Sequence, residues 1–232
     1  MSRLRSGFPP QQSFFLFGPR GTGKSTWVSQ ALPNALHVDL LRQDLWRELD
    51  ARPERLRDHL AANPDKEWIF VDEIQKIPAL LDEIHRAMES QPHRKWALTG
   101  SSARKLKRGA VNLLGGRALR LEMHPYLAHE LGHDFDLVKA LRNGMIPLVW
   151  ESQDPDATLA TYAGMILREE VQAEGLVRNL SAYSRFLETL SFSQGSVLNL
   201  SNVSRECGVD RKTLDGYLSV TEDLLLCHRL PV

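Results

Sequence analysis

Residues 18–25 read G-P-R-G-T-G-K-S, a complete G-x-x-x-x-G-K-[ST] phosphate-binding motif. An apolar run at 13–17 precedes the motif, and a helical pattern at 26–32 follows it. Strand, glycine-rich loop and helix is the arrangement in which this motif binds phosphate. The glycines let successive backbone N–H groups turn toward one anion, at the positive end of the helix dipole. The motif therefore predicts an α/β fold of the P-loop NTPase type. The alternative is a glycine turn that binds nothing.

The residues of this loop have distinct expected roles. We expect Lys24 to reach the β- and γ-phosphates of a bound nucleotide as a point charge. We expect the Ser25 hydroxyl to be a ligand of Mg²⁺. The full set of residues expected to bind the nucleotide is Gly18, Pro19, Arg20, Gly21, Thr22, Gly23, Lys24, Ser25 and Thr26.

Two carboxylates end the buried apolar strand predicted at 68–71. This is a Walker B pattern, in which Asp72 holds Mg²⁺ and Glu73 polarises the attacking water as the catalytic base. Alone, the pair could equally be a solvated strand-to-helix loop. Thr99 and Ser101 leave the next strand, where a hydroxyl can touch the γ-phosphate or the water, or can simply cap the strand end. We favour Thr99 for the catalytic role.

Five strands are predicted before residue 125, at 13–17, 35–40, 68–71, 96–101 and 117–123. They alternate with helical segments, which indicates a parallel sheet. The strand at 35–40 lies in the sequence between the loop strand and the Walker B strand. This order, with Glu directly after Asp, indicates the P-loop branch that has an additional central strand. The chain has no guanine-specifying N-K-x-D string, so ATP is the expected nucleotide.

Beyond residue 125 the pattern is helical. We expect an ATPase core at 1–125, a helical connector or lid-like region at 126–192 and a helix-turn-helix module at 193–232. DNA recognition by the second helix of this module is one reading, with Arg211, Lys212 and Asp215 facing outward. A protein-contact surface is the other, because residues 199–232 carry four basic and five acidic side chains.

The chain resembles a family of prokaryotic AAA+ superfamily ATPases that carry their own C-terminal domain of unknown function. The strings that carry the resemblance are FLFGPRGTGKST, FVDEIQKIPALLDEIH, LTGSSARKL, LGGRALRLEMHPYLAHEL, GMIP, ATYAGMILREEV and SVLNLSNVSRECGVDRKTLDGYL. The resemblance implies a sheet of order 5-1-4-3-2, a helical connector and a winged-helix-like module. It also implies a homo-oligomer in which Arg117 is an arginine finger for the neighbouring subunit; the alternative is an ordinary arginine paired with a surface acid. Members generally continue into a nuclease-like domain, so either a truncated chain or a natural short form is expected.

Composition agrees with a cytoplasmic protein that is not an integral membrane protein. The 29 basic and 29 acidic residues leave no net charge, so a global nucleic-acid footprint is absent. The two cysteines, Cys207 and Cys227, suit a reducing compartment. No apolar run approaches the roughly 18 residues of a membrane helix. The local basic cluster at 104–108 is either a solvated helix face or a polyanion contact.

A competing signal is the H-E-x-x-H string of His129, Glu130 and His133. On a helix it would bind Zn²⁺, with Glu130 as general base and Glu151 or Glu169 as a third ligand. Gly132 makes that helix a poor one. The expected function is therefore a Mg²⁺-dependent ATPase that acts as switch or motor on a client protein. A slow nucleotide switch with a DNA- or protein-binding output is the first alternative, and a zinc metalloprotease is the second.

Overall fold

The computed structural model describes residues 9–101, 113–166, 171, 177 and 179–230. The chain forms two compact units, residues 1–151 and 152–232. The basic cluster at 104–108, Glu169 and most of residues 167–178 of the expected helical connector lie outside the described residues.

Unit 1 is built on a parallel sheet of five strands with the order β2-β3-β4-β1-β5. Read from the other edge this order is 5-1-4-3-2, so the predicted fold is confirmed. The strands are β1 (Phe14–Phe17), β2 (Leu36–Asp39), β3 (Trp68–Asp72), β4 (Lys95–Gly100) and β5 (Leu119–Glu122). The order reverses at β1, because β5 lies on one side of it and the other strands on the other. Open α/β sheets bind ligands beyond the carboxyl ends of the strands at such a reversal.

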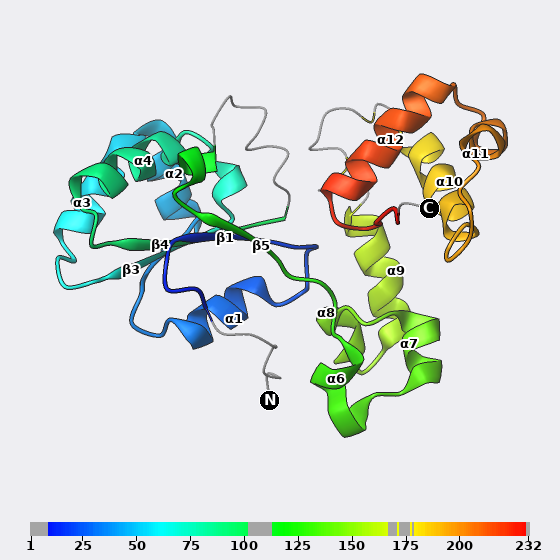
Figure 1. Cartoon of the computed structure of the whole chain (residues 1–232), viewed down its shortest axis with the longest axis horizontal. Coiled ribbons are helices and arrows are strands. Elements are labelled where there is room, and N and C mark those ends of the chain that lie inside the picture. The colour runs from blue at the N-terminus through cyan, green and yellow to red at the C-terminus, as the bar shows by residue number, and fades with distance from the viewer. Residues whose placement is uncertain (1–8, 102–112, 167–170, 172–176, 178, 231–232) are drawn as a thin grey trace. The chain divides into compact units, whose positions relative to one another are not determined.

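Helices cover both faces of this sheet (Figure 1), with α1 on one face and α2, α3 and α4 on the other. The four helices are α1 (Lys24–Ala31), α2 (Gln43–Ala51), α3 (Leu56–Ala61) and α4 (Leu80–Ser90). The central strands β1, β3 and β4 are almost wholly buried, whereas the edge strands β2 and β5 are not. On the α1 face, Val28 packs with Phe14, Leu16, Phe70 and Ala97 of the sheet. Burial on both faces explains why these strands have continuous apolar sequences.

Three short helices complete unit 1: α6 (Ala128–Leu131), α7 (Leu137–Asn143) and α8 (Pro147–Trp150). They share an apolar cluster of Tyr126, Leu131 and Trp150. They also contact the phosphate-binding loop, because the backbone N–H of Leu148 donates to the carbonyl of Gly21 at 3.3 Å. Unit 1 thus extends to residue 151, whereas the ATPase core is expected from the sequence to end at 125; that domain boundary stays a prediction.

The described residues of unit 2 form four helices: α9 (Pro155–Met165), α10 (Leu180–Ser191), α11 (Leu200–Cys207) and α12 (Arg211–Asp223). The rings of Tyr183, Phe186 and Tyr217 pack α10 against α12, with centroids 5.1–5.7 Å apart. The Tyr183 hydroxyl also lies 2.8 Å from the Thr221 hydroxyl. The boundary expected at 192/193 lies between α10 and α12, which pack together, and it stays a prediction.

Helices α11 and α12 are joined by the short turn at 208–210. Gly208 adopts a left-handed conformation with φ of 67°, which ends α11 as glycine commonly does. Asp210 then caps α12 by accepting from the backbone N–H of Thr213 at 3.0 Å. The glycine and the aspartate thus fix the turn expected within 201–217.

Candidate nucleotide site

The phosphate-binding loop spans the gap between β1 and α1, at the carboxyl end of the central strand. Gly23 is the N-cap of α1, in a left-handed conformation with φ of 87°. Gly23 has no side chain with which to cap the first turn of α1. Such an N-terminus, with its positive dipole end, is suited to an anion.

Lys24 is buried, although its side chain carries a charge. Its ammonium donates to the carbonyl oxygens of Gly18 at 2.8 Å and Pro19 at 3.0 Å, which holds the charge over the loop. Thr22 is fully buried and its hydroxyl donates to the Pro19 carbonyl at 2.8 Å. Arg20 and Thr26 are exposed at either side of this curl. The loop residues expected from the sequence therefore lie together around one backbone turn.

Asp72 joins the loop to the neighbouring strands. It ends β3 and is only 3% exposed. Its Oδ1 atom accepts from the Ser25 hydroxyl at 2.9 Å and also from the Thr99 hydroxyl. The three residues come from α1, β3 and β4, whose adjoining ends meet because β3 and β4 run parallel to β1. The structure thus brings together Ser25, Asp72 and Thr99.

Glu73 has a strained backbone, with φ of 60° and ψ of 46°. A left-handed conformation is uncommon outside glycine, and its appearance beside a ligand loop is typical of functional residues. The Glu73 N–H donates to the Thr99 hydroxyl at 3.2 Å. Thr99 is fully buried, and its hydroxyl orients both acidic residues. A direct contact of Thr99 with nucleotide stays a prediction.

Gln75 is a site residue that the sequence reasoning missed. Its side-chain amide Nε2 donates to Oε2 of Glu73 and, at 3.3 Å, to the hydroxyl of Ser101. A glutamine two residues after Glu73 belongs to none of the motifs identified above. The only signal is its place in the turn that follows β3.

Arg117 lies at the other end of the sheet from the loop. It precedes β5, and β5 pairs in parallel with β1 from Leu119 opposite Phe14 onward. Arg117 contacts Nε2 of His85 and donates to Oε1 of Glu89 at 3.2 Å, both on α4. A pairing with a surface acid is therefore present, and a role in a neighbouring subunit stays a prediction.

The H-E-x-x-H string does not form one helix. The helix α6 ends at Leu131, Gly132 follows with φ of 54°, and a separate 3₁₀ turn begins there. The Glu130 carboxylate accepts from the N–H of Leu127 at 2.9 Å, as a helix-capping group does. Among the described residues, no group of three or more His, Cys, Asp or Glu side chains is placed to hold a metal ion.

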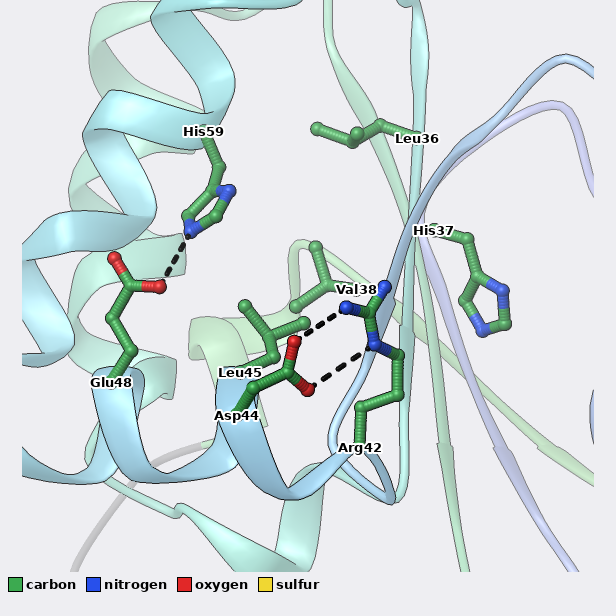
Figure 2. A pocket seen from close by; sticks show the side chains of 8 residues that line it. All are labelled: Leu36, His37, Val38, Arg42, Asp44, Leu45, Glu48 and His59. Carbon is green, nitrogen blue, oxygen red and sulfur yellow. Dashed lines mark hydrogen bonds and ion pairs between the residues drawn. The ribbon is translucent and has the colours of Figure 1, made fainter.

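A separate cavity of about 240 Å³ lies at the β2 edge of the sheet (Figure 2). It is lined by Leu36, His37, Val38, Arg42, Asp44, Leu45, Glu48 and His59. Its charged groups pair with one another: Arg42 with Asp44 at 2.5 Å, and Nε2 of His59 with Oε2 of Glu48 at 3.7 Å. Two strands separate β2 from β1, so this cavity is not part of the phosphate-binding loop.

Two family models match the chain in succession. The first, described as an AAA domain, covers residues 10–132, which is more than half of the chain. The chain belongs to the AAA domain family. The second model, a domain of unknown function (DUF8612), covers residues 134–232. The resemblance drawn from the sequence is thereby confirmed.

Solved structures match the chain only at low identity. The ORC2 protein of Aeropyrum pernix in its ADP form is 13% identical, with a TM-score of 0.41 over 92% of this chain and 80% of that one. AMPPCP-bound DnaA from Aquifex aeolicus is 12% identical, with a TM-score of 0.39 over 93% and 83%. Scores below 0.5 support no inference about function. A search of curated proteins returned no match. Within the described residues, no helix has the length and apolar character needed to cross a membrane.

Proposed function

We propose that this AAA domain protein binds ATP with Mg²⁺ and hydrolyses it, as a switch or motor for a client protein. One observation carries the proposal. The Asp72 carboxylate holds the Ser25 hydroxyl of the phosphate loop at 2.9 Å, while Glu73 stands beside it in a strained conformation. A metal-binding acid next to a catalytic acid is the pair that hydrolysis requires.

The residues at this junction fit Mg²⁺. Magnesium prefers oxygen ligands and commonly keeps several waters, with one or two carboxylates and phosphate oxygens completing its shell. Ser25 and Asp72 supply a hydroxyl and a carboxylate within hydrogen-bond distance of each other. When bound, Mg²⁺ would neutralise charge that develops on the β- and γ-phosphate oxygens.

The remaining chemistry belongs to the side chains and backbone of the chain. The loop N–H groups and Lys24 bind the phosphates, and Glu73 takes a proton from a water molecule as its oxygen attacks the γ-phosphorus. The new P–O bond forms as the bond to the β–γ bridging oxygen breaks. That oxygen leaves with the electron pair, which gives ADP and phosphate.

Two substitutions test this assignment. Lys24→Ala should abolish Mg-ATP binding measured by calorimetry while the circular dichroism spectrum stays unchanged. Glu73→Gln keeps the size of the side chain but loses the base, so it should bind ATP and lose turnover by roughly 10²-fold or more. Glu54→Gln, at an exposed position after α2, is the matched control and should behave as wild type. Normal turnover in Glu73→Gln would remove this residue from the mechanism.

The position of Arg117 favours a homo-oligomer. Arg117 lies near the amino end of β1, whereas the phosphate loop follows the carboxyl end of β1. Arg117 is therefore remote from the loop of its own chain. A guanidinium there is suited to serve a neighbouring subunit, where it can neutralise charge on the γ-phosphate. Light scattering with and without ATP tests for such an assembly.

Helices α11 and α12 are the candidate output of an ATP-driven switch, as a helix-turn-helix module. On α12, Arg211 is paired with Asp215 at 3.2 Å, and Asp210 lies at the helix start. This pairing favours protein contact over DNA binding, because a basic recognition face needs unneutralised cations. Binding to a fluorescent duplex at low salt separates the two outputs.

A further inference from the structure

The most informative contacts outside the expected motif are made by Gln75. It lies in the 3₁₀ turn Ile74–Lys76, which folds back immediately after Glu73. Its amide nitrogen has two N–H groups, and both have acceptors: Oε2 of Glu73 and the hydroxyl of Ser101. An ionised carboxylate only accepts, so the nitrogen and not the oxygen of the amide must face Glu73.

The oxygen of this amide lies on the opposite side, against β4. Oε1 of Gln75 is buried without a hydrogen-bond partner. A Cβ atom on Gly100 would lie 2.7 Å from it, so the amide occupies the space that a side chain at position 100 would need. A buried acceptor without a partner costs free energy. The protein therefore keeps this amide in an unfavourable place, with its donors directed at Glu73 and Ser101.

We infer that Gln75 is a positioning residue that holds the Glu73 carboxylate in the orientation required for hydrolysis. The inference rests on the proposed function, in which Glu73 is the base. The Gln75 amide donates to Oε2 of Glu73 and thereby favours one orientation of that carboxylate. Ser101, which directly follows β4, accepts the other N–H of the amide in turn. Because Gln75 acts through Glu73, it should affect the chemical step and leave ATP affinity unchanged.

Gln75→Met tests this, since methionine keeps the length of the side chain and removes its donors. We expect turnover to fall about tenfold while the Kd for Mg-ATP stays within about twofold of wild type. In the Glu73→Gln background, Gln75→Met should cause no further loss, because residues that act as one unit are not additive. A merely structural role would give the same loss in both backgrounds. Gln75→Asn, which restores an amide one methylene shorter, should recover part of the activity.

A second variant moves the amide without removing it. Gly100 has no positive φ, so Gly100→Ala is compatible with the backbone, and its methyl group must displace Oε1 of Gln75. Turnover should again fall about tenfold, and combination with Gln75→Ala should add nothing. Gln91→Met is the matched control. Gln91 also has a buried Oε1 without a partner, but it precedes β4 at the opposite end of the sheet. It should leave turnover unchanged.

The outcomes separate this inference from the proposed function. No ATP turnover in the wild-type protein would overturn both. Turnover in the wild type, lost in Glu73→Gln but unchanged or increased in Gln75→Met, would overturn the Gln75 inference alone. A further loss of turnover when Gln75→Met is added to Glu73→Gln would show that the amide acts only through the stability of the protein. A loss of turnover in Gln91→Met equal to that in Gln75→Met would show the same.

Discussion

Replacing Thr99 by valine should weaken both the fold and the chemistry of unit 1. Valine matches the shape of threonine but lacks the hydroxyl that bonds Asp72 and accepts from the Glu73 N–H. Thr99 is fully buried, so water cannot easily substitute. A buried donor left without a partner costs about 1–3 kcal/mol, and a hydrogen bond to a charged group is worth about 1.5–3 kcal/mol. Because Asp72 keeps its bond from Ser25, we expect a total loss of about 2 kcal/mol.

The loss is measurable by urea unfolding, and in a unit of this size it corresponds to a fall of about 4–8 °C in Tm. Turnover should fall about tenfold, since both acidic residues lose an orienting contact. Thr99→Ser is the control: it keeps the hydroxyl, loses one buried methyl group and should retain most of the turnover. A Thr99→Val protein with the wild-type unfolding midpoint and wild-type turnover would refute the argument that this hydroxyl connects the two strands energetically.

Three further predictions concern other parts of the chain. Arg117→Ala should bind ATP normally but lose turnover on the order of 10³-fold, and mixing it with Lys24→Ala should restore activity at shared interfaces; full activity of a strict monomer contradicts this. Zinc in protein purified without chelators should be well below one per chain, whereas one tightly bound zinc lost in His129→Ala would support the protease alternative. Burial raises the pKa of Cys227 to about 11 and that of Tyr183 to about 12, from ordinary values of 9.0 and 10.0. The unfolded chain therefore loses these protons first, so the urea midpoint should stay constant below about pH 9 and fall as the pH rises toward 12.

The sheet and the phosphate loop could be predicted because their signals are local. An apolar run such as Phe14–Phe17 must be buried on both faces, and the glycines with Lys24 permit few backbone shapes other than an anion loop. Asp72 follows from the same logic, since it ends a run of the same kind. The strand order came from the family resemblance, and the pairing of the strands confirmed it.

The extent of unit 1 depends on contacts between positions distant in the sequence, which no local pattern reveals. Composition changes after Pro125, where the pattern turns helical, but Leu148 returns to hydrogen-bond with Gly21. The local pattern of apolar residues cannot reveal a contact between residues more than 120 positions apart. The same holds for Gln75, whose partner Ser101 directly follows β4, 26 residues further along the sequence. In the H-E-x-x-H string, by contrast, the local signal of Gly132 was sufficient to predict the break in the helix.

The glycines of the loop illustrate how one sequence pattern combines different physical requirements. Gly23 has φ of 87° and open space around its missing Cβ, so Gly23→Ala should cost only the left-handed strain of about 1–2 kcal/mol. Gly18 has no positive φ, but a Cβ there would lie 2.3 Å from the backbone carbonyl oxygen of Met123. The N–H of Met123 donates to the carbonyl oxygen of Phe17 at 2.7 Å. The Met123 carbonyl therefore cannot move away without breaking the hydrogen bond that joins the segment after β5 to the end of β1. Gly18→Ala should therefore lower the urea midpoint more than Gly23→Ala does. A larger fall of the urea midpoint in Gly23→Ala would show that the left-handed backbone conformation of Gly23 is a stronger constraint than the close approach of Gly18 to Met123.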